Sequence, residues 1–312
     1  MKIACIGNVT YDFTVLGKGF VKEDSKASYT DITINTGGPA CNAAYVISKF
    51  GNQVDFYGQI GKDSFGEYVY NDLQKNGMNI EHLNISNSVM TPFSFIIINT
   101  VNATRTINSI RSKTDLQNPT IEKISYSNNY DYILTDGKYP KESIDLIKAN
   151  PSAISIIDAG RVNPSVIEVC ENVKYIICSE EFANGITGLT INHEYQNDMI
   201  VFNSLKERFP NALGITITVG KYGYICEKKN EVLLMPTYDS KLPAIDTNGA
   251  GDIFHGAFTY ALANGNDYYS ALEFANVTAS LSTTRIGGKD SCPTLEEVNN
   301  IINKHSLKRK LG

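Results

Sequence analysis

The sequence predicts an α/β fold with a mainly parallel central sheet, and three observations support this. Short runs rich in β-branched residues alternate with helical patterns over most of the 312 residues, which is typical of βαβ units. Several of these runs end in polar or glycine-containing loops, as strands do at the ligand-binding edge of such sheets. The chain is also long enough to bury one large core. We therefore expect a single domain over residues 1–312.

The composition excludes several functional classes. The chain is 42% hydrophobic and 20% charged with a net charge of −5, and this mildly acidic balance argues against nucleic acid as the main partner. No apolar run approaches the roughly 20 residues that cross a bilayer, and the first apolar run is too short for a signal peptide. The six cysteines form no Cys-x-x-Cys pair and mostly fall in apolar stretches. We therefore expect reduced core thiols in a cytoplasmic protein without a membrane partner.

The first strand and the segments that follow it predict a second, smaller sheet. Residues 3–7 predict a buried strand, and Asp12 follows in a loop at its carboxyl end. Alternating β-branched residues then interrupt the βαβ rhythm in two patches, within residues 13–36 and within 93–107. These patches predict a β lid over about 12–36 and 91–110. The core then comprises about 1–11, 37–90 and 111–312.

The next elements are a helix and a series of strand-to-loop transitions. Gly38 and Pro39 predict a glycine turn that opens a helix, which Gly51 ends. Polar residues follow apolar runs at residues 132–137, 154–161, 175–182 and 215–220. Asp158 and Arg161, in the second of these loops, either form a structural ion pair or lie near phosphates, and we favour the structural ion pair.

The stretch 245–257 predicts a tight loop that opens a helix near Ala250. The first amides of a helix lack internal partners and its N-terminus is positive, while Gly249 and Gly251 allow an anion to approach the backbone. Asp252 lies in the same first turn, where a carboxylate can act as the general base for a hydroxyl that attacks a phosphoryl group. Gly256 lies on the same helix face and is expected to leave room for a bulky alcohol.

Two motifs resemble those of a known family. The run Asp246-Thr247-Asn248-Gly249-Ala250-Gly251-Asp252 resembles the C-terminal signature of the ribokinase-like (PfkB) carbohydrate kinases, and Gly37-Gly38 with Asn42 resembles their N-terminal motif. The resemblance extends from residue 2 to about 298 and implies a three-layer ribokinase-like fold with a β lid. It implies a sugar kinase that uses Mg²⁺ with ATP, with Asp252 as the base. The implied anion hole and sugar contacts are the amides of Gly249, Ala250 and Gly251, and Asp12, Gly38 and Asn42.

The resemblance also implies nucleotide and cation sites. The nucleotide contacts would be Thr218, Gly220, Gly223 and Asn276, and backbone carbonyls near Asp246, Asn248 and Ser282 would form a monovalent-cation site for K⁺. Where many relatives have Asn-x-x-Glu, this chain has Ser179 and Phe182, with Glu180 and Glu181 as neighbouring acidic residues. Arg105 is either a surface residue or a contact to substrate or phosphate, because the usual Gly-Glu-Arg is Ala103-Thr104-Arg105 here.

The substrate is expected to be a ketose such as fructose. Residues 37–40, 254–257 and 284–288 look closest to the fructokinase, ketohexokinase and sulfofructose kinase branch. The alternatives are a nucleoside or sugar-phosphate kinase of the same fold, or a sugar-binding regulator without turnover. A dinucleotide-dependent dehydrogenase is disfavoured, because no Gly-x-Gly-x-x-Gly follows the first strand. The resemblance finally implies a homodimer formed through the lid strands.

Overall fold

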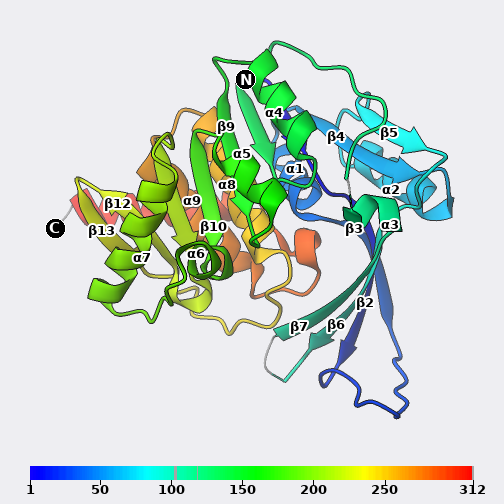
Figure 1. Ribbon diagram of the computed structural model, residues 1–312. Helices are drawn as coiled ribbons and strands as arrows, with labels where there is room; N and C mark the ends of the chain where they lie inside the picture. Colours follow the sequence, from blue (N-terminus) through cyan, green and yellow to red (C-terminus); the bar gives the residue numbers. More distant parts are fainter. Residues whose placement is uncertain (102–103, 118, 311–312) are drawn as a thin grey trace.

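The computed structural model of the protein describes residues 1–101, 104–117 and 119–310 (Figure 1). Its central sheet has nine strands in the order β13-β12-β11-β10-β9-β8-β1-β4-β5. The strands from β11 to β5 are parallel, and β12 and β13 add an antiparallel hairpin at one edge. The strands are β1 (Ile3–Ile6), β4 (Val54–Gly61), β5 (Leu83–Ser86), β8 (Tyr132–Thr135), β9 (Ile154–Ala159), β10 (Tyr175–Ser179), β11 (Gly214–Thr218), β12 (Tyr224–Lys228) and β13 (Glu231–Met235).

Helices cover both faces of this sheet, which gives the expected three layers (Figure 1). One layer contains α1 (Pro39–Lys49), α2 (Ser64–Lys75), α8 (Ala250–Ala263), α9 (Tyr268–Ser282) and α10 (Leu295–Lys310). The other contains α4 (Pro140–Ala149), α5 (Pro164–Cys170), α6 (Glu180–Thr187) and α7 (Tyr195–Arg208). The short helices are α3 (Lys113–Gln117), η1 (Gly220–Tyr222) and η2 (Gly288–Ser291).

Strand β1 shows why these residues form a central strand. Ile3 and Cys5 pack into the core beneath α1 and α8, whereas Ala4 and Ile6 pack into the core on the opposite face. All four side chains are fully buried. A strand that is covered on both faces requires such a continuous apolar run, and this explains why the sequence alone identified it.

A separate four-stranded sheet, the small sheet, lies at the carboxyl edge of the central sheet and projects from the main body (Figure 1). Its order is β3-β2-β6-β7, with β2 and β6 parallel and the two outer pairs antiparallel. Its strands are β2 (Thr10–Gly17), β3 (Ile32–Gly37), β6 (Phe93–Asn99) and β7 (Thr104–Ile110). The strand patches expected for the lid are therefore present, although Asn102 and Ala103 lie outside the described residues. Asp12 lies within β2 rather than in a loop, because β2 already begins at Thr10.

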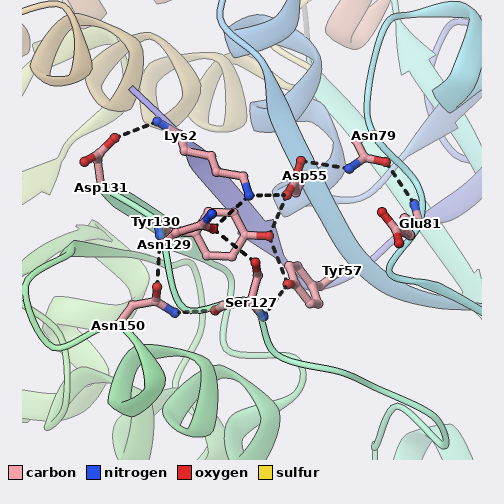
Figure 2. A network of polar contacts seen from close by, with 10 residues as sticks. All are labelled: Lys2, Asp55, Tyr57, Asn79, Glu81, Ser127, Asn129, Tyr130, Asp131 and Asn150. Carbon is pink, nitrogen blue, oxygen red and sulfur yellow. Dashed lines mark hydrogen bonds and ion pairs between the residues drawn. The ribbon is translucent and has the colours of Figure 1, made fainter.

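A network of polar contacts joins the amino ends of β1, β4 and β8, at the edge opposite the small sheet (Figure 2). The Tyr130 hydroxyl donates to Asp55 at 2.6 Å and lies 2.9 Å from the Tyr57 hydroxyl. The Lys2 ammonium donates to Asn129 at 2.7 Å. Two of these contacts join the loop before β8 to β4, and the third joins it to Lys2, directly before β1. The network therefore fixes this loop onto the two neighbouring strands.

Two expectations from composition can be compared with the structure. Among the described residues, no helix combines the length and the apolar character that crossing a membrane requires. All six cysteines are buried and unpaired, which confirms that they are core thiols.

Candidate active site

The loop before α8 leaves the first backbone amides of the helix weakly bonded or without a helical partner, at the end of α8 that faces the loop. Gly249 is the N-cap and has a φ of 74°, which favours glycine, and a Cβ there would lie 3.2 Å from the Gly288 backbone. The amide of Ala250 makes only a long contact of 3.4 Å to the Thr247 carbonyl. A Cβ on Gly251 would meet no atom within 4 Å, so open space lies in front of this turn. The first turn of α8 therefore presents amide donors to a space that a phosphoryl group can occupy.

Asp252 lies in this first turn and contacts the predicted sugar-binding helix. Asn42, near the start of α1, donates from Nδ2 to Asp252 Oδ2 at 2.6 Å. Burial and the nearby carboxyl of Asp158 raise the pKa of Asp252 to about 7, while the Asn42 hydrogen bond, His255 and Arg105 oppose the rise. A carboxyl group with such a pKa is well matched to proton transfer near neutral pH. The structure thus brings together two residues that the sequence predicted from separate motifs.

Asp158 and His255 lie beside Asp252 and were not predicted as part of the site. His255 Nδ1 is 3.3 Å from Asp158 Oδ2, and the exposed fractions of the two side chains are 4% and 13%. Burial, followed by the charge of Asp136, raises the pKa of Asp158 to about 8. Our interpretation of Asp158 and Arg161 as an ion pair was therefore wrong. Arg161 extends into solvent and pairs with Glu181 at 3.7 Å.

The other predicted sugar-binding residues lie at the start of the small sheet. Asp12 accepts a hydrogen bond from Thr10 Oγ1 at 2.8 Å, and burial raises its pKa. Gly38 has a φ of 102°, and a Cβ there would lie 2.4 Å from the Asn8 carbonyl, so only glycine fits this turn. Gly38 therefore lets the loop before α1 pass against the segment that follows β1.

A cavity lies between the small sheet and the loop at η2. Two buried polar atoms of its lining, Thr36 Oγ1 and Asn42 Oδ1, have no hydrogen-bond partner among the described residues. Lys289 also lines the cavity, but its buried ammonium pairs with Asp72 at 2.9 Å. Buried polar groups are rarely left unpaired, so these two atoms are available to a polar ligand in the cavity.

Arg105 extends from β7 of the small sheet to the loop before α8. Its Nη1 donates to Thr247 Oγ1 at 3.4 Å, and its charge opposes the rise in the pKa of Asp252. This guanidinium links the small sheet to the loop before α8. Arg105 is exposed, as the first interpretation of the sequence has it, and it reaches this loop, as the second requires, so its contact to substrate or phosphate stays a prediction.

Gly256 does not leave room for an alcohol, so that expectation was wrong. A Cβ on Gly256 would lie 2.5 Å from the Ala43 carbonyl and 2.8 Å from Val46 Cβ, both in α1. Gly256 does share a helix face with Asp252, but this face packs against α1. Its missing side chain allows the close approach that lets Asn42 reach Asp252.

The segment in place of Asn-x-x-Glu has a structural role. Ser179 caps α6 by accepting from the Phe182 amide at 3.0 Å, and its hydroxyl donates to the Gly160 carbonyl at 2.7 Å. Phe182 is completely buried. Glu181 is exposed and pairs with Arg161. We find no acidic cluster in this segment that would hold a divalent metal.

The four predicted nucleotide-binding residues have the following environments. Thr218 donates to the Cys178 carbonyl at 3.2 Å, and Asn276 donates to the Pro236 carbonyl at 2.9 Å. Gly220 has a φ of 56° and open space at its Cβ position. Gly223 has a φ of 107°, and a Cβ there would clash with the Met235 carbonyl, so backbone geometry and strand packing together explain this glycine. Their nucleotide contacts remain predictions.

Groups of the residues predicted to bind a monovalent cation already take part in hydrogen bonds within the protein. The Asp246 carboxylate accepts from the Asn248 amide at 2.8 Å and from the Gly287 amide at 3.0 Å. The Ser282 carbonyl accepts from the Arg285 amide at 3.1 Å. Within the part of the chain that the structure describes, no group of three or more His, Cys, Asp or Glu side chains could hold a metal ion.

Asp136 is a further residue of the site that the sequence analysis did not select. It follows β8, and its carboxylate accepts from the amides of Asn8 at 2.8 Å and Ala40 at 3.3 Å. Burial raises its pKa, which these amides oppose. The sequence did place polar residues at the carboxyl end of this strand, which was the available signal.

Three features lie together at the carboxyl edge of a parallel sheet: a helix start suited to an anion, an adjacent buried carboxyl, and a cavity with unpaired polar groups. Together they define a phosphotransferase that acts on a hydroxyl group. A sequence profile described as pfkB family carbohydrate kinase matches residues 1–295. The chain belongs to this family and is an ATP-dependent carbohydrate kinase.

Individual relatives agree with this assignment. The ribokinase of Bacillus subtilis (strain 168) is 26% identical over 308 residues, which cover 96% of this chain and 99% of the relative. The deoxyribokinase of Salmonella typhi is 23% identical over 315 residues, covering 97% and 99%. The structure of Arabidopsis thaliana ribokinase complexed with ribose and ATP has a TM-score of 0.79 at 20% identity, covering 96% and 97%, which supports the fold. These names do not support the ketose branch that we expected.

Proposed function

We propose that the protein transfers the γ-phosphoryl group of ATP to a hydroxyl of an uncharged monosaccharide. Ribose or a related pentose is the first candidate substrate because the named relatives act on such sugars, and a ketose such as fructose is the second because of the motifs. The observation that carries the proposal is the pair of buried unpaired atoms, Thr36 Oγ1 and Asn42 Oδ1, beside Asp12 and Asp252. Sugar hydroxyls would complete these hydrogen bonds.

The residues have distinct roles in this reaction. ATP with Mg²⁺ supplies the phosphoryl group. Asp252 accepts the proton of the attacking hydroxyl, and Asn42 orients the carboxylate through its 2.6 Å hydrogen bond. The first-turn amides at Gly249, Ala250 and Gly251 stabilise the charge of the transferred group, and Arg105 adds a positive charge from the small sheet.

An uncharged substrate is favoured over a sugar phosphate by the ion pairs around the site. Lys289 is paired with Asp72 at 2.9 Å, and Lys138 is paired with Asp115 at 2.9 Å. Arg111 also contacts Asp115 at 3.4 Å. Lys289 has a carboxylate of its own, whereas Lys138 and Arg111 share Asp115. All three cations therefore already contact a carboxylate, which makes them poorer partners for a second phosphate group.

A coupled ADP-release assay with Mg-ATP tests the proposal. The panel contains ribose, deoxyribose, fructose, tagatose, glucose, fructose 6-phosphate and adenosine, with Asp252→Asn as the variant. We expect turnover of one free sugar and a fall in kcat of about 10²- to 10⁴-fold in the variant, because general-base catalysis contributes that much. Asp145→Asn, which alters an exposed carboxyl paired with Lys141, should retain wild-type kcat.

Two outcomes would contradict the proposal. If adenosine has a higher kcat/KM than every sugar in the panel, the protein is a nucleoside kinase rather than a sugar kinase. Absence of turnover for the whole panel, with a sugar that still raises the melting temperature, would favour a binding protein. The K⁺ site remains a prediction of the resemblance, and replacing K⁺ by Na⁺ in the same assay tests it.

A further inference from the structure

The buried imidazole of His255 has no role in the reaction described above. It lies on α8, and 4% of its side chain is exposed. Nδ1 is 2.6 Å from the Gly251 carbonyl, and Nε2 is 3.1 Å from the Ile177 carbonyl in β10. Asp158 Oδ2 is 3.3 Å from the same Nδ1. Both ring nitrogens are therefore engaged by fixed groups of the protein.

The carbonyl contacts indicate where the ring carries its proton. A carbonyl oxygen can only accept, so a ring nitrogen must carry hydrogen to form a hydrogen bond with it. Burial lowers the pKa of His255, which the two carbonyls and Asp252 oppose, and this favours a neutral ring with one N–H. We assign that proton to Nδ1 because its carbonyl contact is the shorter one.

This hydrogen bond acts on a peptide group of the anion-binding turn. The Gly251 carbonyl belongs to the same peptide unit as the Asp252 N–H. Asp252 is the third residue of α8, so its N–H has no partner within the helix and points toward the N-terminal end. Donation to a carbonyl polarises its peptide and strengthens the N–H of that unit as a donor, by about 10–30% per bond.

We infer that His255 is a positioning residue for phosphoryl transfer, and this inference rests on the proposed function. Through the Gly251 carbonyl it fixes the peptide that carries both an anion-binding N–H and the general base Asp252. Asp158 Oδ2, 3.3 Å from the same Nδ1, and the burial of the ring hold it in the orientation that this requires. The titratable groups near this cluster are Asp158 on β9, Asp252 on α8, Asp136 after β8, Cys178 on β10 and Arg105 on β7.

A pair of amide variants separates the two ring contacts. In His255→Asn the side-chain amide nitrogen can take the place of Nδ1 and donate to the Gly251 carbonyl. In His255→Gln the longer side chain places its amide near the position of Nε2, toward Ile177. We expect His255→Asn to keep kcat within about threefold of wild type. We expect His255→Gln to lose about tenfold or more in kcat with little change in the sugar KM, because weakening an anion-hole donor acts on the transition state.

The readouts distinguish positioning from packing. If the ring only fills space, both variants lose kcat in parallel with their melting temperatures, and the inference is overturned. A His255→Gln variant with wild-type kcat overturns it as well. If the wild-type protein turns over none of the sugars, the proposed function fails instead.

A second measurement does not depend on turnover. The amide-proton resonance of Asp252, observed in ¹⁵N-labelled protein, should move upfield in His255→Gln relative to wild type and to His255→Asn. An unchanged resonance in His255→Gln would show that the ring does not polarise this peptide, and would contradict the inference even if the variant were less active.

Discussion

At the scale of single residues, the pKa of Asp252 depends on opposing contributions. Burial and the Asp158 carboxyl raise it to about 7, whereas the Asn42 amide, His255 and Arg105 lower it. The proposed base acts only when it is deprotonated. Activity should therefore be about half-maximal near pH 7, approach its full value about one unit higher, and decrease by about tenfold for each pH unit below.

Replacing Asn42 tests this balance. Removing its hydrogen bond should raise the pKa of Asp252, so the acidic limb of the kcat profile of Asn42→Ala should move to higher pH than in wild type. The measurement is kcat from pH 5 to 9 at saturating sugar. Asn264→Ala, which removes an exposed asparagine on the far end of α8, should leave the limb in place. If the acidic limb of the kcat profile is unchanged in Asn42→Ala, the hydrogen bond from Asn42 does not determine the pKa of Asp252.

The residues of the site differ in how well the sequence identified them. Gly249, Gly251 and Asp252 were found because a helix start with glycines and a carboxylate forms one local pattern. His255 and Asp158 were missed because their contact joins α8 to β9 across 97 residues of sequence. A local pattern shows which residues share an element but not which side chains from other elements lie opposite them.

At the scale of elements, α8 uses glycine for two different purposes. Gly251 faces open space, whereas Gly256 lies against the α1 backbone, where a Cβ would be 2.5 Å from the Ala43 carbonyl. The 3.6-residue period correctly placed Gly256 on the face of Asp252. It did not reveal that α1 covers this face, since helix packing depends on elements that are distant in sequence.

The two glycines give a matched pair of alanine variants. Gly251→Ala should keep the wild-type melting temperature but lower kcat/KM by about 10²-fold or more, because its methyl group occupies the phosphoryl space and displaces the anion from the amides. Gly256→Ala should lower the free energy of unfolding by about 1–3 kcal/mol, because α1 and α8 must move apart. Denaturant unfolding and the ADP-release assay measure the two effects. Equal losses of stability in both variants would contradict the assignment of open space at Gly251.

At the scale of the whole molecule, the carboxyl and amino edges of the central sheet have different roles. The carboxyl edge carries the candidate site, while the amino edge carries the network around Tyr130 and Asp55 (Figure 2). The sequence predicted the central strands well, because buried parallel strands are continuous apolar runs. It gave no indication of this network, whose members come from loops and strand ends with no common motif.

Tyr130→Phe should therefore change stability without changing catalysis. Removing the hydroxyl leaves Asp55 without its 2.6 Å donor and Tyr57 without its partner at 2.9 Å, which should cost about 1–3 kcal/mol of unfolding free energy. The values of kcat and KM should remain those of wild type at 25 °C. Tyr29→Phe, in the exposed segment before β3, serves as the control. A change in KM in Tyr130→Phe would indicate that the two edges are coupled.

The small sheet supports the homodimer that the resemblance implies, which remains a proposal. Among the described residues, no further strand pairs with its outer strands β3 and β7. These strands carry exposed apolar side chains at Ile32 and Ile107, which are 55% and 47% exposed. In sedimentation velocity we expect a concentration-dependent dimer that Ile107→Asp shifts to monomer. The exposed Leu213→Asp, outside the small sheet, should not affect association. A protein that stays monomeric at all concentrations would contradict the proposal.

The contact between Asn42 and Asp252 also has a consequence for biosynthesis. The two residues are 210 positions apart, and the face of α1 that carries Asn42 packs against α8. A ribosome therefore releases α1 long before it has made the helix that covers this apolar face. Until then the nascent chain exposes a surface that can aggregate. We expect chains that stop before α8 to depend on chaperones. The catalytic centre should form only after α8 has been synthesised and has packed against α1.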